Sequence, residues 1–276
     1  MITAASLWSL LALSAASQPP PQSVGVHPPV DTLVRVGGHD LHFVLYRGTK
    51  PVTVLLEAGG GADLASWADV PKRLADEIGA TVVAYDRAGL GGSGSLSPDS
   101  RPIDEVRDLQ SALDLLKVPQ RTIMVGHSYG AMLAVLNAGS YPKRVAGLVL
   151  VDPMNTRFIE ATGDFIFSTV PAIPHPSNER ERTVVRMVAT FPDLIREVSR
   201  LEPGLRQPIV VITAGKPWWG REDIDRAWRR SHEALATAGM QRHLVVAEGS
   251  DHGVPEKRPE VIVASVQTLL KVVTGQ

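Results

Sequence analysis

The stretch Arg121-Thr-Ile-Met-Val-Gly-His-Ser128-Tyr-Gly130-Ala-Met-Leu-Ala-Val-Leu136 decides the fold of this chain. It reads as an apolar strand, a Gly-His-Ser-Tyr-Gly turn with Ser128 at its apex, and an apolar helix. Glycines on either side of the turn remove the Cβ atoms that would crowd it. A serine hydroxyl is a poor nucleophile unless it is exposed to a base, and the N-terminus of the following helix favours developing negative charge. The pattern therefore predicts that Ser128 is a nucleophile.

Apolar runs alternate with helical patterns on both sides of this turn. Two alternating runs at 32–36 and 41–46 flank Gly37-Gly38 and predict a β-hairpin. Solid apolar runs, typical of strands in a parallel sheet, lie at 52–56, 81–85, 122–125, 145–151, 208–213 and 243–247. Further helices are expected at 66–78, 103–116, 223–238 and 259–273. The chain is therefore predicted to be an α/β protein with a mostly parallel central sheet and helices on both faces.

The alternation breaks between about residues 153 and 204. A Pro-rich span at 171–176 and a charged helical pattern at 178–200 predict a short helical cap. Such an insertion is expected over the carboxyl edge of the sheet, where ligands bind in folds of this class. We expect residues 31–276 to form one domain that carries this cap.

The composition narrows the classes of function. The 276 residues carry a formal net charge of −1 and no local cluster of Lys and Arg, which argues against a nucleic-acid partner. The absence of cysteine excludes a thiol nucleophile, a thiolate metal site and a disulfide framework. The sequence contains no HExxH, EF-hand or P-loop pattern, and Gly89–Gly94 does not fit a dinucleotide fingerprint. We expect neither a metal ion nor a cofactor.

The N-terminal residues indicate the cellular location of the protein. Residues 4–17 are apolar and of signal-peptide length, and Gln18-Pro-Pro-Pro21 follows them directly. We therefore expect residues 1–17 to be a signal peptide, residues 18–30 a Pro-rich linker, and the protein to be secreted or periplasmic. No Lys or Arg precedes the apolar run, so a cytoplasmic protein with an N-terminal extension is the alternative. The run is too short for a stable membrane span.

A nucleophilic serine requires a base, and the chain has eight histidines. His252 follows the last predicted strand, in Glu248-Gly-Ser-Asp-His-Gly253, where a short loop can bring its imidazole back over the sheet edge. Six of the other histidines lie on the hairpin, inside the turn, in the insertion, or within a predicted helix or strand. His252 is therefore the predicted general base.

Five stretches together resemble the α/β-hydrolase fold family, and the turn at Ser128 resembles the nucleophile elbow of serine esterases and lipases. These stretches are Leu55–Gly61, Tyr85–Ser93, Gly126–Gly130, Leu148–Pro153 and Gly249–Gly253. The resemblance implies a catalytic triad in the chain order serine, acid, histidine. Serine at the elbow argues against the dehalogenase and epoxide-hydrolase branches of the fold, which use an aspartate there.

The resemblance also implies an oxyanion hole made of two backbone N–H groups. One belongs to Tyr129, directly after the nucleophile, and the other to Gly60 in the glycine-rich loop after the 52–56 strand. Ala58 stands where the family usually has a histidine. A slip of one residue in this alignment would give the second role to Gly59 or Gly61.

The acid of the triad has two candidates. The family usually places it after the strand at 208–213, but here the chain continues into Gly215-Lys-Pro-Trp-Trp219 without a carboxylate. The resemblance therefore favours Asp152, which directly follows the 145–151 strand, the acid position of some family members. Asp223 is the alternative, although carboxylates at that point also suit the start of a helix.

These features together predict hydrolysis of carboxylic esters through an acyl-enzyme, with small or medium substrates because the cap is short. Trp218 and Trp219 are expected to line the substrate pocket, or else to pack the insertion against the core. Alternative reactions on the same scaffold are amide cleavage, N-terminal peptide cleavage as in aminopeptidases, lactone opening and C–C bond hydrolysis. Amine substrates would call for acidic groups in the cap, such as Glu179 or Glu181. A non-catalytic binding protein is the alternative from a different class.

Overall fold

The structure, a computed structural model, describes residues 28–163, 165–169, 172–239 and 241–275. The predicted signal peptide, residues 1–17, and residues 18–27 of the predicted linker lie outside the described residues. Within the described ranges, none of the helices combines the length and apolar character needed to cross a bilayer.

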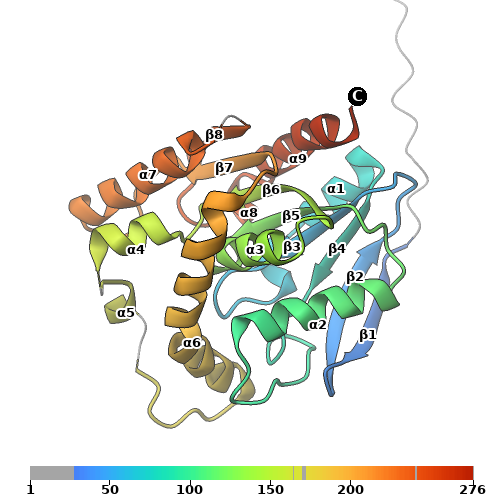
Figure 1. The fold of residues 1–276 in the computed structure, drawn as a ribbon, viewed down its shortest axis with the longest axis horizontal. Coiled ribbons are helices and arrows are strands. Elements are labelled where there is room, and N and C mark those ends of the chain that lie inside the picture. The colour runs from blue at the N-terminus through green and yellow to red at the C-terminus, as the bar shows by residue number, and fades with distance from the viewer. Residues whose placement is uncertain (1–27, 164, 170–171, 240, 276) are drawn as a thin grey trace, which may run out of the picture.

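An eight-stranded sheet forms the centre of the fold (Figure 1). Its strands are β1 (Val30–Val36), β2 (His39–Tyr46), β3 (Thr53–Glu57), β4 (Thr81–Tyr85), β5 (Thr122–His127), β6 (Val145–Val151), β7 (Ile209–Ala214) and β8 (Arg242–Ala247). They lie in the order β1-β2-β4-β3-β5-β6-β7-β8. The β1–β2 and β2–β4 pairs are antiparallel, and every pair from β4 to β8 is parallel. The predicted mostly parallel sheet is confirmed.

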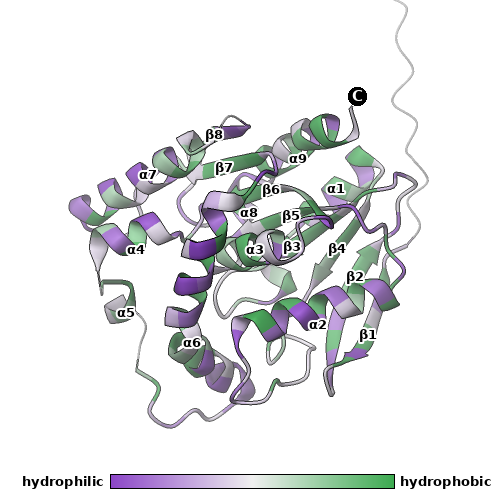
Figure 2. Ribbon diagram, viewed as in Figure 1, coloured by the Kyte–Doolittle hydropathy of each residue, from purple (hydrophilic) through white to green (hydrophobic). Residues whose placement is uncertain are grey.

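Helices cover both faces of this sheet (Figure 1). The helices α1 (Val70–Ile78) and α9 (Pro259–Thr274) pack on one face, and α2 (Pro102–Leu115), α3 (Tyr129–Ser140) and α7 (Glu222–Thr237) pack on the other. Successive side chains of a strand point to opposite faces, so a strand covered on both must be apolar throughout. In β5, Ile123 and Val125 join the core under α1 and α9, while Met124 joins the core under α2 and α3. Figure 2 shows the corresponding hydropathy, with mostly hydrophobic central strands and mixed colouring along α6 and α7.

The segment between β6 and β7 forms the cap. It contains α4 (Thr156–Thr162), α5 (Phe165–Thr169), α6 (Glu179–Leu201) and the 3-10 turn η2 (Glu202–Gly204). The long helix α6 packs against α2 and α3. A nearly buried ion pair, Arg186 Nη1 to Glu105 Oε1 at 2.9 Å, joins α6 to α2. The segment predicted as an insertion at about 153–204 therefore lies over the helices next to Ser128.

The helices before β4 and after β8 differ from the sequence prediction. The helix expected from residue 66 begins at Val70, because residues 64–67 form a separate 3-10 turn, η1 (Leu64–Trp67). Pro71 then occupies the first turn of α1, where its missing N–H leaves no hydrogen bond unmade. The short helix α8 (Val254–Lys257) is absent from the prediction, and Arg258, whose backbone is not helical (φ −140°, ψ 51°), separates it from α9.

Candidate active site

Ser128 occupies the apex of the turn between β5 and α3. Its φ of 52° is strained for a residue with a side chain, and such strain persists only where the surrounding structure enforces it. The flanking glycines are required by close packing: a Cβ on Gly126 would lie 2.6 Å from the oxygen of Gly130, and one on Gly130 would lie 2.3 Å from the oxygen of Glu57. The N–H of Ser128 also donates to the oxygen of Val151 at 3.1 Å. The predicted strand-turn-helix is therefore present and tied to the neighbouring strands.

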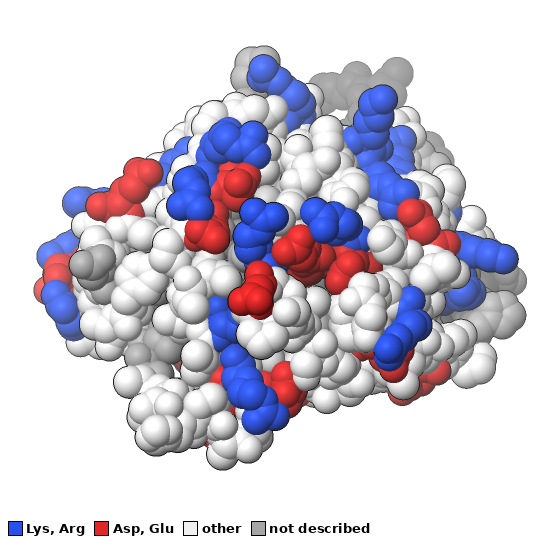
Figure 3. Space-filling model, turned by 60° about the horizontal axis from the view of Figure 1, so that its bottom comes forward, with Lys and Arg blue, Asp and Glu red and all other residues white. Residues whose placement is uncertain are grey.

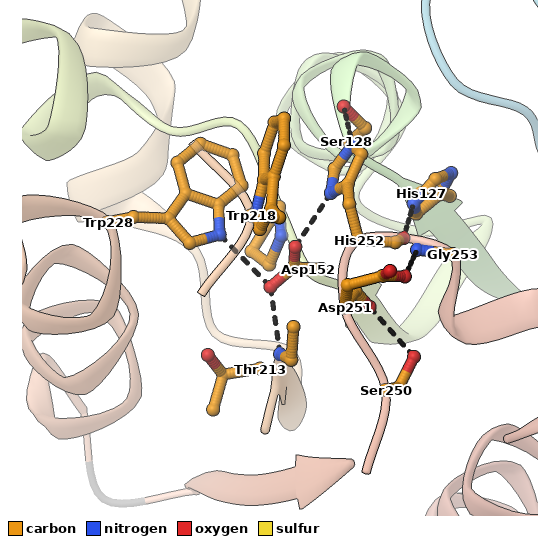
Figure 4. A network of polar contacts seen from close by, with 12 residues as sticks. His127, Ser128, Asp152, Thr213, Trp218, Trp228, Ser250, Asp251, His252 and Gly253 are labelled. Carbon is orange, nitrogen blue, oxygen red and sulfur yellow. Dashed lines mark hydrogen bonds and ion pairs between the residues drawn. The ribbon is translucent and has the colours of Figure 1, made fainter. Parts of the chain in front are cut away.

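Three side chains at the carboxyl ends of three strands form one hydrogen-bonded chain (Figure 4). His252 Nε2 lies 3.0 Å from Ser128 Oγ, and His252 Nδ1 lies 2.7 Å from Asp152 Oδ2. These residues follow β8, β5 and β6, and parallel strands present their carboxyl ends at one edge. The His252 side chain is 25% exposed, whereas Asp152 is fully buried. A chain of this kind can pass a proton from a serine hydroxyl to an imidazole whose tautomer the carboxylate holds.

Asp152 is held by more than its contact with His252. Its Oδ1 accepts the backbone N–H of Ala214 at 2.9 Å and the indole N–H of Trp228 at 3.0 Å. Burial alone would raise the pKa of Asp152, but the hydrogen bond with His252 and the nearby imidazoles outweigh it and lower the pKa. The carboxylate is therefore ionised at neutral pH.

The alternative acid, Asp223, is held elsewhere. It lies in the first turn of α7 with a side chain that is 58% exposed, and its Oδ2 accepts a hydrogen bond from Arg221 at 2.6 Å. Glu222 and Asp225 lie in the same first turn, where acidic side chains interact favourably with the helix dipole. Of the two candidates, the fold brings Asp152 and not Asp223 to His252.

Two aromatic rings flank the imidazole of His252 (Figure 4). On one side the indole of Trp218 stacks at a centroid distance of 4.1 Å and an interplanar angle of 15°. On the other side the His127 ring lies 4.6 Å away, and its Nε2 donates to the backbone oxygen of His252 at 2.9 Å. Burial lowers the pKa of His127 to about 4, and the proximity of His252 adds to the shift. His127 is therefore neutral at neutral pH and carries its proton on Nε2.

A pocket of about 260 Å³ opens on Ser128. Helices α5 and α6 of the cap supply much of its wall, and the wall is largely apolar. The lining residues are Gly60, Gly61, Ser128, Tyr129, Met154, Ile166, Phe167, Val184, Met187, Val188 and Phe191. A wider groove of about 810 Å³ lies at the opposite, amino edge of the sheet, between residues 120–121 and 204–208. The pocket under the cap is thus the one that adjoins the candidate nucleophile.

Neither Trp218 nor Trp219 is among the residues that line this pocket, and the packing of Trp219 against Phe158 of the cap helix α4 fits the alternative expectation instead. Asp225 Oδ1 accepts the backbone N–H groups of both residues at 3.0 Å, which turns the loop after β7 toward α7. Trp219 consequently stacks on Trp218 at 3.9 Å and on Phe158 at 5.6 Å. Trp218 contacts the ring of His252 instead of the pocket wall.

The two predicted oxyanion donors, Gly60 and Tyr129, both line the pocket beside the serine. The loop that carries Gly60 is fixed from behind by the buried guanidinium of Arg87, which donates to the carbonyl oxygens of residues 58–59. Arg87 is also paired with Glu57 at 3.0 Å. Burial raises the pKa of Glu57, and the charge of Arg87 opposes this shift. A buried ion pair thus anchors the glycine-rich loop.

The surface charges are interspersed. On the face drawn in Figure 3, basic and acidic side chains lie next to one another. Many pairs are local, such as Arg107 with Asp104 at 2.9 Å and Arg200 with Glu197 at 2.7 Å, and exposed pairs of this kind are largely screened by solvent. In the part of the chain that the structure describes, no three His, Cys, Asp or Glu side chains gather in a metal-binding cluster.

Comparison with known proteins agrees with this fold. Residues 52–173 match the family model described as the alpha/beta hydrolase fold. The chain therefore has the α/β-hydrolase fold.

Several known proteins resemble most of the chain. This α/β-hydrolase fold protein is 27% identical over 229 residues to the uncharacterized protein YqjL of Bacillus subtilis strain 168, across 82% of this chain and 87% of that one. It is 25% identical over 248 residues to the biotin biosynthesis bifunctional protein BioHC of Cellvibrio japonicus, across 79% of this chain but 47% of that protein. The crystal structure of a thermophilic esterase from Thermogutta terrifontis matches with a TM-score of 0.66 at 20% identity, across 90% and 99% of the two chains. At this identity the structural likeness shows the fold alone.

Sequence reasoning missed three supporting contacts of the candidate site. These are the indole of Trp228 on Asp152, the guanidinium of Arg87 behind the glycine-rich loop, and the stack of Trp218 on His252. Trp228 and Asp152 are 76 residues apart, so no local spacing relates them. The tryptophans of a chain with few aromatic residues were the single available signal.

Proposed function

We propose that this α/β-hydrolase fold protein is a serine hydrolase that cleaves carboxylic esters of small or medium substrates through an acyl-enzyme. The observation that carries the proposal is the hydrogen-bonded chain Ser128–His252–Asp152 beside an apolar pocket. Fold alone does not establish an activity, and this arrangement of side chains supplies the chemical argument.

In the first half of the reaction, Ser128 Oγ attacks the ester carbonyl carbon while His252 Nε2 accepts the hydroxyl proton. The carbonyl oxygen becomes an oxyanion, which the backbone N–H groups of Gly60 and Tyr129 stabilise. When the tetrahedral intermediate collapses, His252 returns the proton to the leaving alkoxide oxygen. The products of this half are an alcohol and an acyl group on Ser128.

In the second half, water takes the place of the alcohol. His252 Nε2 accepts a proton from this water as its oxygen attacks the acyl carbon, and the same two N–H groups hold the oxyanion. Collapse then returns the proton to Ser128 Oγ and releases a carboxylic acid. Asp152, which is ionised and buried, keeps Nδ1 of His252 protonated and stabilises the imidazolium in both halves.

The lining of the pocket favours an apolar acyl group. Most of its wall comes from Met, Ile, Phe and Val side chains, and none of the lining residues within the described ranges is acidic. Glu179, which an amine substrate would call for, is instead paired with Arg182 at 2.9 Å. Glu181 accepts the backbone N–H of Ser177 at 2.6 Å. Amine recognition in the cap therefore has no support, and esters are the better candidates.

The test compares wild type and Ser128→Ala on p-nitrophenyl esters from acetate to decanoate. We expect serine-dependent turnover that falls by about a thousandfold or more in the variant, with the fold intact by circular dichroism. We also expect one fluorophosphonate adduct per wild-type chain and none on Ser128→Ala. Equal turnover by the two proteins would refute the serine mechanism, and a wild type inactive on every ester would refute ester hydrolysis.

A further inference from the structure

The face of the proposed base His252 is covered by an indole. The rings of Trp218 and His252 are nearly parallel, at 15° and a centroid distance of 4.1 Å. Trp219 stacks on Trp218 at 3.9 Å. Two rings cannot occupy the same face of one indole at such distances, so Trp219 lies on the face of Trp218 opposite to His252. The rings of Trp219, Trp218 and His252 therefore form a column of three, with the imidazole at one end.

This column is held in place by contacts of its own. The carboxylate of Asp225 accepts hydrogen bonds from the backbone N–H groups of Trp218 and Trp219, and these bonds fix the loop after β7. Trp228 packs edge-on against Trp218 at 5.5 Å and also donates to Asp152. Trp228 thus contacts both the indole on the face of His252 and the carboxylate at its edge (Figure 4).

We propose that Trp218 is a positioning residue that stabilises the imidazolium form of His252 through its π face. The inference rests on the proposed function, in which His252 becomes positively charged in each half of the reaction. The negative face of an indole attracts a cation, and Trp is the best of the aromatic side chains in this respect. An uncharged imidazole gains less from the stack, so the interaction strengthens as the proton arrives, which is when it accelerates the reaction.

The titratable groups around His252 are compatible with stabilisation of its imidazolium form by the indole of Trp218. From β6, Asp152 meets its Nδ1 edge. From β5 and α7, His127 and His232 are buried imidazoles whose pKa values are lowered by that burial, so neither adds positive charge at neutral pH. In the adjoining loop, Asp251 is paired with Lys257 of α8. The imidazolium is therefore stabilised by a carboxylate at its edge and an indole on its face.

The first experiment follows the protonation of His252 by NMR of histidine-labelled protein, with no substrate present. We expect Trp218→Leu to move the midpoint of this titration to lower pH by roughly half to one pH unit, and Trp218→Phe to move it less. The resonance of His252 is assigned with His252→Gln. An unchanged midpoint in a folded Trp218→Leu protein would overturn the proposal.

The second experiment keeps the size of the ring and changes its charge distribution. Fluorinated tryptophans are placed at position 218 by site-specific incorporation, because each fluorine weakens the negative face of the indole. We expect kcat/KM for a p-nitrophenyl ester to fall stepwise with fluorine number, by about tenfold over the series, and its acid limb to move to lower pH. The same series at Trp219, which stacks on Trp218 rather than on His252, serves as the control and is expected to be nearly flat. A flat series at 218, or equal slopes at both positions, would overturn the proposal, because a purely structural role depends on shape.

Failure of this inference is distinguishable from failure of the proposed function. The titration of His252 requires no turnover, so it tests the stack even if no ester is cleaved. Conversely, serine-dependent ester hydrolysis with no effect of Trp218 on either readout would leave the proposed function standing and refute the role of the indole.

Discussion

Trp228 donates its indole N–H to Oδ1 of Asp152 at 3.0 Å. A second donor, the N–H of Ala214 at the end of β7, meets the same oxygen at 2.9 Å. With Oδ1 engaged by two donors, Oδ2 is left to face Nδ1 of His252. A backbone N–H and a group of tryptophans thus follow β7, where the resemblance would place an acid, and they orient the carboxylate of Asp152, which directly follows β6.

The first prediction separates the two candidate acids. Asp152→Asn is expected to lower kcat about 10³- to 10⁴-fold, because an amide cannot hold the Nδ1-protonated tautomer of His252 or stabilise its imidazolium. Asp223→Asn, at an exposed helix start, is the matched control and is expected to keep kcat within about twofold. Steady-state kinetics on one ester measure kcat for both variants. A larger loss of kcat in Asp223→Asn than in Asp152→Asn would assign the role of the acid to Asp223 in α7.

The second prediction concerns the size of the pocket. Phe191 lines it and packs against Tyr129 and Phe167 at ring distances of 5.9 and 5.7 Å. Phe191→Ala is expected to raise the preference for long over short acyl chains roughly tenfold in kcat/KM, at a cost of about 3 kcal/mol in the free energy of unfolding. Phe165→Ala, in α5 but outside the lining, is the control. An identical chain-length profile in both variants would exclude this pocket as the acyl site.

The third prediction is an acid-side loss of stability that originates at His127. Its pKa is lowered from 6.5 to about 4 in the folded protein, chiefly by burial, so the unfolded chain binds the proton more tightly. The associated stability is full above about pH 6.5 and is lost as pH falls toward 4, by about 3 kcal/mol. Urea unfolding at pH 7 and pH 4 measures this loss.

His127→Asn provides the comparison for this third prediction, because an amide can still donate to the oxygen of His252 but does not titrate. The difference in unfolding free energy between pH 7 and pH 4 is expected to be smaller in this variant by about the same 3 kcal/mol. Equal differences in the two proteins would show that His127 does not stay neutral in the folded state.

The fourth prediction has the opposite sign and concerns the hairpin. His42 on β2 bonds Asp86 through Nδ1 at 2.7 Å and Asp31 on β1 through Nε2 at 2.9 Å. Partial burial opposes protonation of this ring, but the two carboxylates outweigh it and raise the pKa of His42 above 6.5. The stability that protonated His42 gives to the folded protein is therefore present below about pH 6.5. It is lost as the pH rises through the folded-state pKa of His42.

Comparison with His42→Asn tests this fourth prediction. The variant should be less stable than wild type at pH 6, by less than about 1 kcal/mol because Asp31 is largely exposed, and the difference should shrink at pH 9. Urea midpoints at the two pH values measure it. A difference that grows with pH would contradict the assignment of a protonated His42.

Local sequence determined the elements of this protein and the turn that carries the candidate nucleophile Ser128. The solid apolar runs identify strands buried on both faces, and the turn at Gly37-Gly38, where both residues have positive φ, identifies the hairpin. The glycines at 126 and 130 identify the sharp turn at Ser128, because each closely approaches backbone where no Cβ fits. These features depend on residues near one another in the chain, which is why spacing alone reveals them.

Tertiary structure alone decided the strand order, the partner of the histidine and the environment of its ring. Asp152 and Asp223 were both candidate acids by spacing, and the parallel pairing of β6 with β7 and of β7 with β8 brings the first within reach of His252. Sequence alone left the tryptophans at 218 and 219 either to line a pocket or to pack against the core, and Asp225 turns them onto His252 and α7. Contacts such as these join residues separated by many positions along the chain, and their geometry follows from packing across the sheet edge, which no local pattern encodes.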